Sequence, residues 1–228
     1  MMRAGMGRAA AAGRSACCRA RSVLRLVGVA FAAAVLGACA SSAPMRYYTL
    51  TQIAPEARVA LPPETAPIQL NRVSVPGELD RTQLVRRIDA TRLQIAELDR
   101  WAAPVDEMIR RVLAADLAAR LPPNLVVDPN ESLPGERQGL SVDILEFYAD
   151  SGCAVMLRAT WVLVAPQTQG AQKGARSPGS TRVSEETQVP GSACSGPGAV
   201  PEAMSRALAQ LSDRVVAHIA NSATARPP

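Results

Sequence analysis

The cysteine at position 39 constrains the fold most, because everything before it is expected to be removed. Residues 26–35 form an apolar run, which is shorter than the roughly 20 residues that a membrane-spanning helix needs. The tetrapeptide Leu36-Gly37-Ala38-Cys39 follows and has the form of a lipobox, in which small residues precede a cysteine that takes up lipid. We therefore predict a cleavable lipoprotein signal peptide over residues 1–38, with Cys39 as the acylated first residue of the mature chain.

The predicted anchor consists of covalent lipid, namely a diacylglycerol and an N-linked acyl chain such as palmitate on Cys39, and we expect no other cofactor. Ala40 follows the cysteine, whereas Asp at that position is the inner-membrane retention signal in lipoprotein sorting. The sequence thus predicts attachment to the periplasmic side of the outer membrane of the cell envelope. An uncleaved inner-membrane anchor and a true start at Met2 or Met6 stay open.

The basic character of the chain lies in this signal. The 228 residues hold 25 Lys and Arg against 20 Asp and Glu, but six arginines and no acid precede Cys39. The 190 residues of the mature chain therefore carry 19 cations against 20 anions. This balance gives no support to nucleic-acid binding, and the length suits one domain.

Proline and serine are frequent after Cys39, which predicts a lipidated N-terminus and flexible tether over residues 39–67. Within this stretch, Tyr47-Tyr48-Thr49-Leu50 has the composition of a short strand. Its two tyrosines either pack on the core or lie at the membrane interface. We expect one folded domain over residues 68–222 and a disordered tail over 223–228.

Two patterns predict an α+β domain. Apolar residues repeat at helical spacing over 104–121 and 201–220, and each stretch begins with a proline. Alternation and β-prone composition indicate strands at 68–75, 125–127, 140–148 and 153–165 and a polar edge strand at 181–190. Residues 79–97 have mixed spacing, which indicates short strands or turns. Because one face of each strand is apolar, we expect an antiparallel sheet with both helices packed on one face.

Two cysteines remain after the signal and the anchor, in a compartment where disulfides persist. If the strands that begin at Cys153 and end at Cys194 form a hairpin around the loop 166–180, paired residue numbers sum to about 347. Cys153 and Cys194 meet that sum and are then directly opposed, near disulfide reach. The alternative is two separate thiols.

No arrangement typical of catalysis is found in the sequence. His218 is the only histidine, which excludes the common zinc sites and most nucleophile–histidine pairs. We read it as a surface or boundary residue. Lys173 is the only lysine and does not complete a phosphate-binding loop, and residues 191–196 lack the spacing of a nucleophile elbow. The sequence therefore predicts no enzyme, no metal site and no catalytic residue.

Three segments resemble the PqiC-type lipoproteins, also called ABC-type transport auxiliary lipoproteins. The first is the lipobox with Tyr47-Tyr48-Thr49-Leu50 behind it. The second runs from Val73 to Val85 and contains Leu79-Asp80-Arg81, although Thr82 stands where that family often has proline. The third is Arg100-Trp101-Ala102-Ala103-Pro104 in front of the first helix. The resemblance marks Leu79, Asp80, Arg81 and Trp101 as motif residues, whose role is structural or functional.

The resemblance implies a non-catalytic accessory of an MCE-type intermembrane phospholipid transport system. Such lipoproteins accompany an MCE-domain protein and the inner-membrane permease or other ABC-transporter components, and dock or organise the complex. Homo-oligomerisation, the lipid that moves and the docking surface stay open. The alternative function is a structural envelope lipoprotein that binds peptidoglycan or an envelope assembly machine.

Overall fold

The structure is a computed structural model of the 228-residue chain, and it describes residues 43–127, 137–164, 181–189, 196 and 198–224. The chain divides into two compact units, Met1–Pro44 and Met45–Pro228. Almost all described residues belong to the second unit, which contains every described helix and strand. Cys39 and Cys194 lie outside the described residues.

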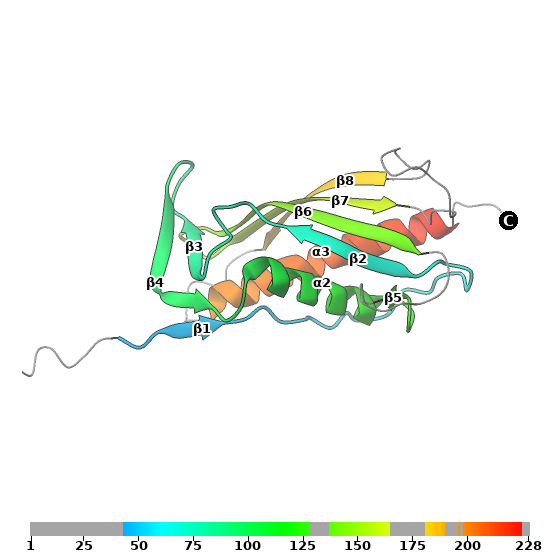
Figure 1. The fold of residues 1–228 in the computed structure, drawn as a ribbon, viewed down its shortest axis with the longest axis horizontal. Coiled ribbons are helices and arrows are strands. Elements are labelled where there is room, and N and C mark those ends of the chain that lie inside the picture. The colour runs from blue at the N-terminus through cyan, green and yellow to red at the C-terminus, as the bar shows by residue number, and fades with distance from the viewer. Residues whose placement is uncertain (1–42, 128–136, 165–180, 190–195, 197, 225–228) are drawn as a thin grey trace, which may run out of the picture. The chain divides into compact units, whose positions relative to one another are not determined.

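The second unit is an α+β domain, as predicted. Its elements in chain order are β1 (Arg46–Tyr48), β2 (Ile68–Ser74), β3 (Gln83–Arg87), β4 (Leu93–Trp101), α2 (Val105–Arg120), β5 (Val126–Val127), β6 (Gln138–Ala149), β7 (Val155–Val164), β8 (Thr181–Val189) and α3 (Ala199–Thr224). Figure 1 shows them along the domain. Within the described residues, neither helix combines the length and hydropathy needed to cross a bilayer.

The sheet is mixed and not antiparallel, which corrects the prediction. The antiparallel pairs are β3 with β4, β6 with β7, and β7 with β8. However, β6 runs parallel to both β2 and β3, and β1 runs parallel to β4. The reason lies in the connections: α2 and three strands (β3, β4 and β5) separate β2 from β6, and such a crossover allows parallel pairing. Alternation along a strand reports which face is buried, and it carries no information on strand direction.

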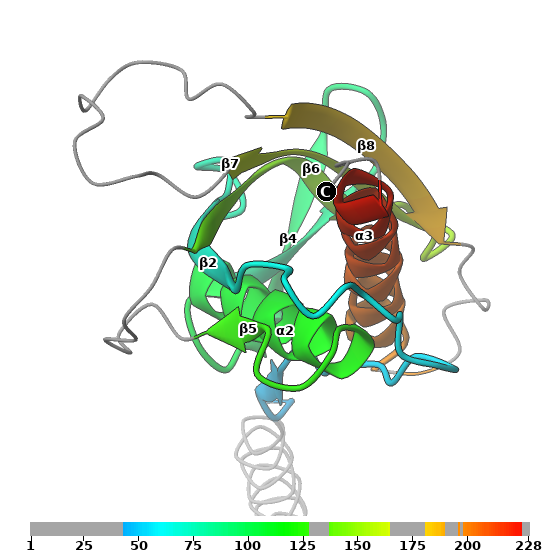
Figure 2. The ribbon, with the colours of Figure 1, turned by 90° about the vertical axis from the view of Figure 1, so that its right-hand side faces the viewer.

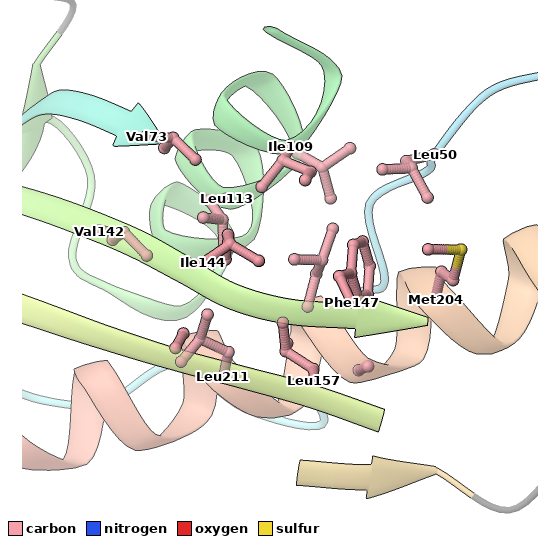
Figure 3. Packing of buried hydrophobic residues seen from close by; sticks show 14 of the residues in the cluster. Leu50, Val73, Ile109, Leu113, Val142, Ile144, Phe147, Leu157, Met204 and Leu211 are labelled. Carbon is pink, nitrogen blue, oxygen red and sulfur yellow. The ribbon is translucent and has the colours of Figure 1, made fainter. Parts of the chain in front are cut away.

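Both helices lie in the hollow of the curled sheet, so the prediction of one covered face is correct (Figure 2). Helix α2 begins after Pro104, whose missing N–H would have no helical partner there, and it ends at Arg120, with Leu121 as the cap before two prolines. Alternate residues of β7 belong to the core, among them Leu157 and Trp161, as expected of a strand with one apolar face. Leu157 lies in the same buried cluster as Phe147 of β6 and Leu211 of α3 (Figure 3).

The folded domain starts earlier than residue 68, so the predicted tether is too long at its C-terminal end. Leu50 is 3% exposed and belongs to the core. The N–H of Thr51 donates to Ser205 Oγ at 3.1 Å, and the N–H of Val59 donates to the carbonyl of Arg120 at 2.8 Å. The prolines of this stretch prevent a regular ladder, but the helices supply the hydrogen-bond partners that a strand would otherwise provide. We call residues 49–59 the strap.

The β7–β8 hairpin has a register different from the predicted one. Val155 pairs with Val189 and Leu163 with Thr181, so paired numbers sum to 344 and not to 347. Cys153 lies before the ladder in a turn, with φ of 62°. Cys153 is therefore not a ladder residue directly opposed to Cys194, which corrects the predicted register. The prediction of an edge strand is correct, because β8 pairs only with β7 among the described strands.

Candidate functional site

The motif residues lie at one corner of the domain, which we call the motif corner: Leu79, Asp80, Arg81 and Trp101. A tight turn after β2 forms it, in which the N–H groups of Leu79 and Asp80 both donate to the carbonyl of Pro76. The N–H of Trp101, at the end of β4, donates to the carbonyl of Thr82 at 2.7 Å. Segments about 20 residues apart in the sequence are therefore joined directly.

The motif corner divides into a buried pair and an exposed pair. Leu79 and Trp101 are each 6% exposed, and both line the same small apolar cavity of about 10 Å³. Its other walls are Val85, Val105, Phe147 and Met204. This volume holds no ligand larger than water, so Leu79 and Trp101 act as packing residues. Asp80 and Arg81 are exposed on the surface of the turn.

A polar brace flanks this corner. The hydroxyl of Tyr148 donates to Glu78 Oε1 at 2.9 Å, and the guanidinium of Arg87 lies 4.6 Å from the centre of the Tyr148 ring. Burial, and secondly the Glu78 carboxylate, raise the pKa of Tyr148 to about 12. The backbone N–H and then the tyrosine hydroxyl lower the pKa of Glu78. The hydrogen bond between Tyr148 and Glu78 therefore joins the turn after β2 to β6.

An ionic cluster holds the strap against both helices, and we call it the latch: the buried Asp116 and Arg120, and Asp213, whose side chain is 57% exposed. Arg120 Nε donates to Asp213 Oδ1 at 2.6 Å, and its Nη1 lies 3.3 Å from Asp116 Oδ1 and 3.1 Å from the carbonyl of Ile53. Asp116 Oδ1 accepts the N–H of Ile53 at 3.0 Å. Both polar groups of one strap residue are thus bound by charged side chains of α2.

Burial is the main feature of the latch. The side chains of Asp116 and Arg120 are 0% and 4% exposed, and Asp116 Oδ2 has no hydrogen-bond partner among the described residues. Burial raises the pKa of Asp116 to about 6, against the lowering effect of the Ile53 N–H and Arg120. A groove of about 550 Å³ lies beside the latch. Its lining combines strap residues 53–57 with Arg120, Arg206, Ala209, Gln210 and Asp213.

The latch was not among the candidate sites predicted from the sequence. The available signal was the spacing of Asp116 and Arg120, which at i and i+4 lie on the same helical face. The third contact comes from a strap that looked like a flexible tether. Because the strap was not expected to fold onto the helix, the sequence did not predict that Asp116 and Arg120 are buried.

The remaining candidate residues are dispersed. His218 is half-buried, as predicted for a boundary residue, and its ring lies 4.9 Å from that of Trp161 in an edge-on contact. Cys153, the one cysteine within the described residues, is disulfide-bonded. Its partner lies outside those residues, so pairing with Cys194 stays a prediction. Across the described ranges, no group of three or more His, Cys, Asp or Glu residues could hold a metal ion.

Comparison with known families assigns the chain. Residues 48–216 match the model of the ABC-type transport auxiliary lipoprotein component. The chain belongs to this family. The match covers the strap, the motif corner and the latch, and it confirms the family that the three motif segments resemble. The auxiliary lipoproteins are components associated with ABC-type transport systems, and theirs is not a known enzyme family.

Solved structures share the fold of this auxiliary lipoprotein. The crystal structure of an uncharacterized protein is 20% identical, with a TM-score of 0.61 over 78% of this chain and 99% of that chain. A DUF330 protein from Xanthomonas campestris is 16% identical, with a TM-score of 0.60 over 78% of this chain and 97% of that chain. At these identities the likeness concerns the fold alone. No functionally curated protein matches the sequence.

Proposed function

We propose that this auxiliary lipoprotein is anchored through Cys39 to the periplasmic face of the outer membrane and serves an MCE-type phospholipid transport system. The observation that carries the proposal is the family match over residues 48–216, directly behind a lipobox at Cys39. The protein docks or organises the MCE-domain protein and the inner-membrane ABC components. It has no turnover chemistry of its own.

The polar clusters of the domain support a binding role over a catalytic one. The Tyr148–Glu78 pair and the latch both join distant segments of the chain. Neither contains a nucleophile beside a base, the arrangement that covalent catalysis needs. Each cluster is therefore explained by the stability of a docking domain.

Affinity capture from crosslinked envelopes tests the proposal. A C-terminally tagged protein is crosslinked in living cells, captured under denaturing conditions and its partners identified by mass spectrometry. We expect an MCE-domain protein and ABC-transporter components to be enriched over a tagged, unrelated outer-membrane lipoprotein. Enrichment of peptidoglycan fragments or of an assembly machine in their place would favour the structural envelope lipoprotein instead.

A further inference from the structure

Apolar side chains that face solvent are concentrated at one end of the domain. Among the described residues, seven large hydrophobic side chains are exposed, and six of them belong to β1, β4 and the segments that adjoin them. These six form what we call the apolar end: Met45, Tyr47, Ile88, Leu93, Ile95 and Leu98. Their exposed fractions run from 38% to 64%, which is unusual for a cluster on a soluble surface.

The sheet order places these residues on contiguous strands. β1 pairs with β4, and β4 pairs with β3. Figure 1 shows β1 and the β3–β4 hairpin at the same end of the domain, away from the C-terminal end of α3. The hairpin leaves the body of the domain, so Leu93 and Ile95 have no core to cover them, although Trp101 on the same strand is buried.

The hairpin tip is held in one conformation. Asp89 Oδ1 accepts the N–H groups of Thr91 and Arg92, each at 2.9 Å, and Asp89 Oδ2 accepts Arg92 Nε at 2.5 Å. The N–H of Ile88 donates to the carbonyl of Arg92 at 2.9 Å. These hydrogen bonds preorganise the tip and so reduce the ordering cost of presenting Ile88 and Leu93 on binding.

Charge and chain length indicate what covers the apolar end. Residues 46 and 81–101 contain six arginines and three acids, whereas the mature chain as a whole carries 19 cations against 20 anions. Basic residues beside exposed apolar ones are typical of surfaces that bind anionic lipid headgroups.

Six residue steps separate Cys39 from Met45, and a chain of that length spans at most roughly 20 Å. A lipid anchor on Cys39 thus keeps β1 within that distance of the bilayer.

We propose that the apolar end contacts the membrane in which the anchor sits, with Met45, Tyr47 and the β3–β4 tip inserted among the lipid headgroups. This inference rests on the anchor in the proposed function. It fixes the orientation of the domain, so that the C-terminal end of α3 points away from the bilayer. It also assigns to Tyr47 the membrane-interface role that the sequence left open, while Tyr48 packs against the core.

Quenching by brominated lipids tests the contact. Mature lipidated protein is reconstituted into phosphatidylethanolamine–phosphatidylglycerol vesicles with and without bromine on the upper acyl chain. Leu93→Trp is the reporter, Ile88→Trp repeats it at the tip, and Ala217→Trp on the exposed face of α3 is the matched control. The parent protein corrects for Trp101 and Trp161, which are both buried.

We expect the tip reporters to lose emission in brominated vesicles and the control to keep its emission. Equal quenching of tip and control in protein that floats with vesicles would overturn the membrane contact and leave the anchor standing. If the tryptophan emission maximum of a tip reporter shifts to shorter wavelength but bromine does not quench it, the apolar end is covered by a second copy or another protein and not by lipid. If intact-mass spectrometry finds no lipid on the protein and the protein does not float with the vesicles, both the anchor and the contact are overturned.

Discussion

At the scale of single residues, the latch places two charges where almost no water reaches them. Removing one member of a buried ion pair leaves the other uncompensated, which typically costs about 3–5 kcal/mol. Arg120 also binds the carbonyl of Ile53 and the carboxylate of Asp213. Its loss therefore frees the strap together with Asp116.

Replacing Arg120 by leucine is expected to lower the free energy of unfolding by about 3 kcal/mol. Arg111→Leu is the matched control, because Arg111 is exposed on the same helix and should change stability by roughly 0.5 kcal/mol or less. Urea unfolding of the two variants measures the difference. Equal midpoints would show that the latch contributes nothing.

Asp116 gives the latch a pH dependence with a definite sign. Burial raises its pKa from 3.8 to about 6, so the folded state holds the proton over a range in which the unfolded state releases it. Stability therefore falls as pH rises from about 4 to about 6 and levels off above. Two pKa units correspond to about 3 kcal/mol.

Asp116→Asn removes this titration while it keeps an oxygen for the Ile53 N–H. The native chain is expected to lose stability relative to the variant between about pH 4 and pH 6, measured by unfolding at each pH. Parallel pH profiles for the two proteins would contradict the raised pKa of Asp116.

The proposed Cys153–Cys194 bridge would close a loop of about 40 residues, worth roughly 3–4 kcal/mol in the chain-entropy model. Non-reducing peptide mapping of the mature protein should recover the two cysteines in one linked peptide. Two free thiols per chain, counted in denaturant without reductant, would show that the bridge is absent.

At the scale of elements, the strap was predicted as part of a flexible tether, but it belongs to the folded domain. Leu50→Ala should cost about 2–4 kcal/mol, because it removes a buried leucine from a core that cannot fully close around the gap. Thr51→Ala is the control, since Thr51 is exposed and its contact with Ser205 is through the backbone. Similar thermal unfolding of both variants would indicate that the strap is only loosely attached.

The sequence predicted those helices and strands whose apolar pattern is regular within the element itself. The stripe of α2 and the alternation of β7 follow from residues within one element, and both are found as expected. The β3–β4 region was less regular because its register shifts between Gln83 and Val85. A bulge of this kind disrupts the period on which strand prediction depends.

The sequence could not reveal the features that depend on distant contacts. Parallel pairing of β2 with β6 follows from a long connection, and burial of Asp116 follows from a strap 63 residues away. The motif corner was found as a set of motif residues. Only the structure separates its packing residues, Leu79 and Trp101, from the exposed Asp80 and Arg81.

At the scale of the whole molecule, we assign separate functions to the lipobox and to the auxiliary lipoprotein domain. In the proposed function, an anchor on Cys39 holds the protein at a membrane, and the domain presents its surfaces to the partners. Cys39→Ala should abolish incorporation of labelled palmitate and leave an uncleaved precursor with residues 1–38 attached. Palmitate on that variant would place the acylation elsewhere.

The central claim is that the anchored domain acts only as a part of the transport system. The most direct measurement compares envelope phospholipid exchange in strains that lack this protein, lack the MCE-domain partner, or lack both. We predict that the double deletion is no worse than either single deletion, and that the native chain restores exchange but Cys39→Ala does not. An additive defect in the double deletion, or full rescue by Cys39→Ala, would contradict the account.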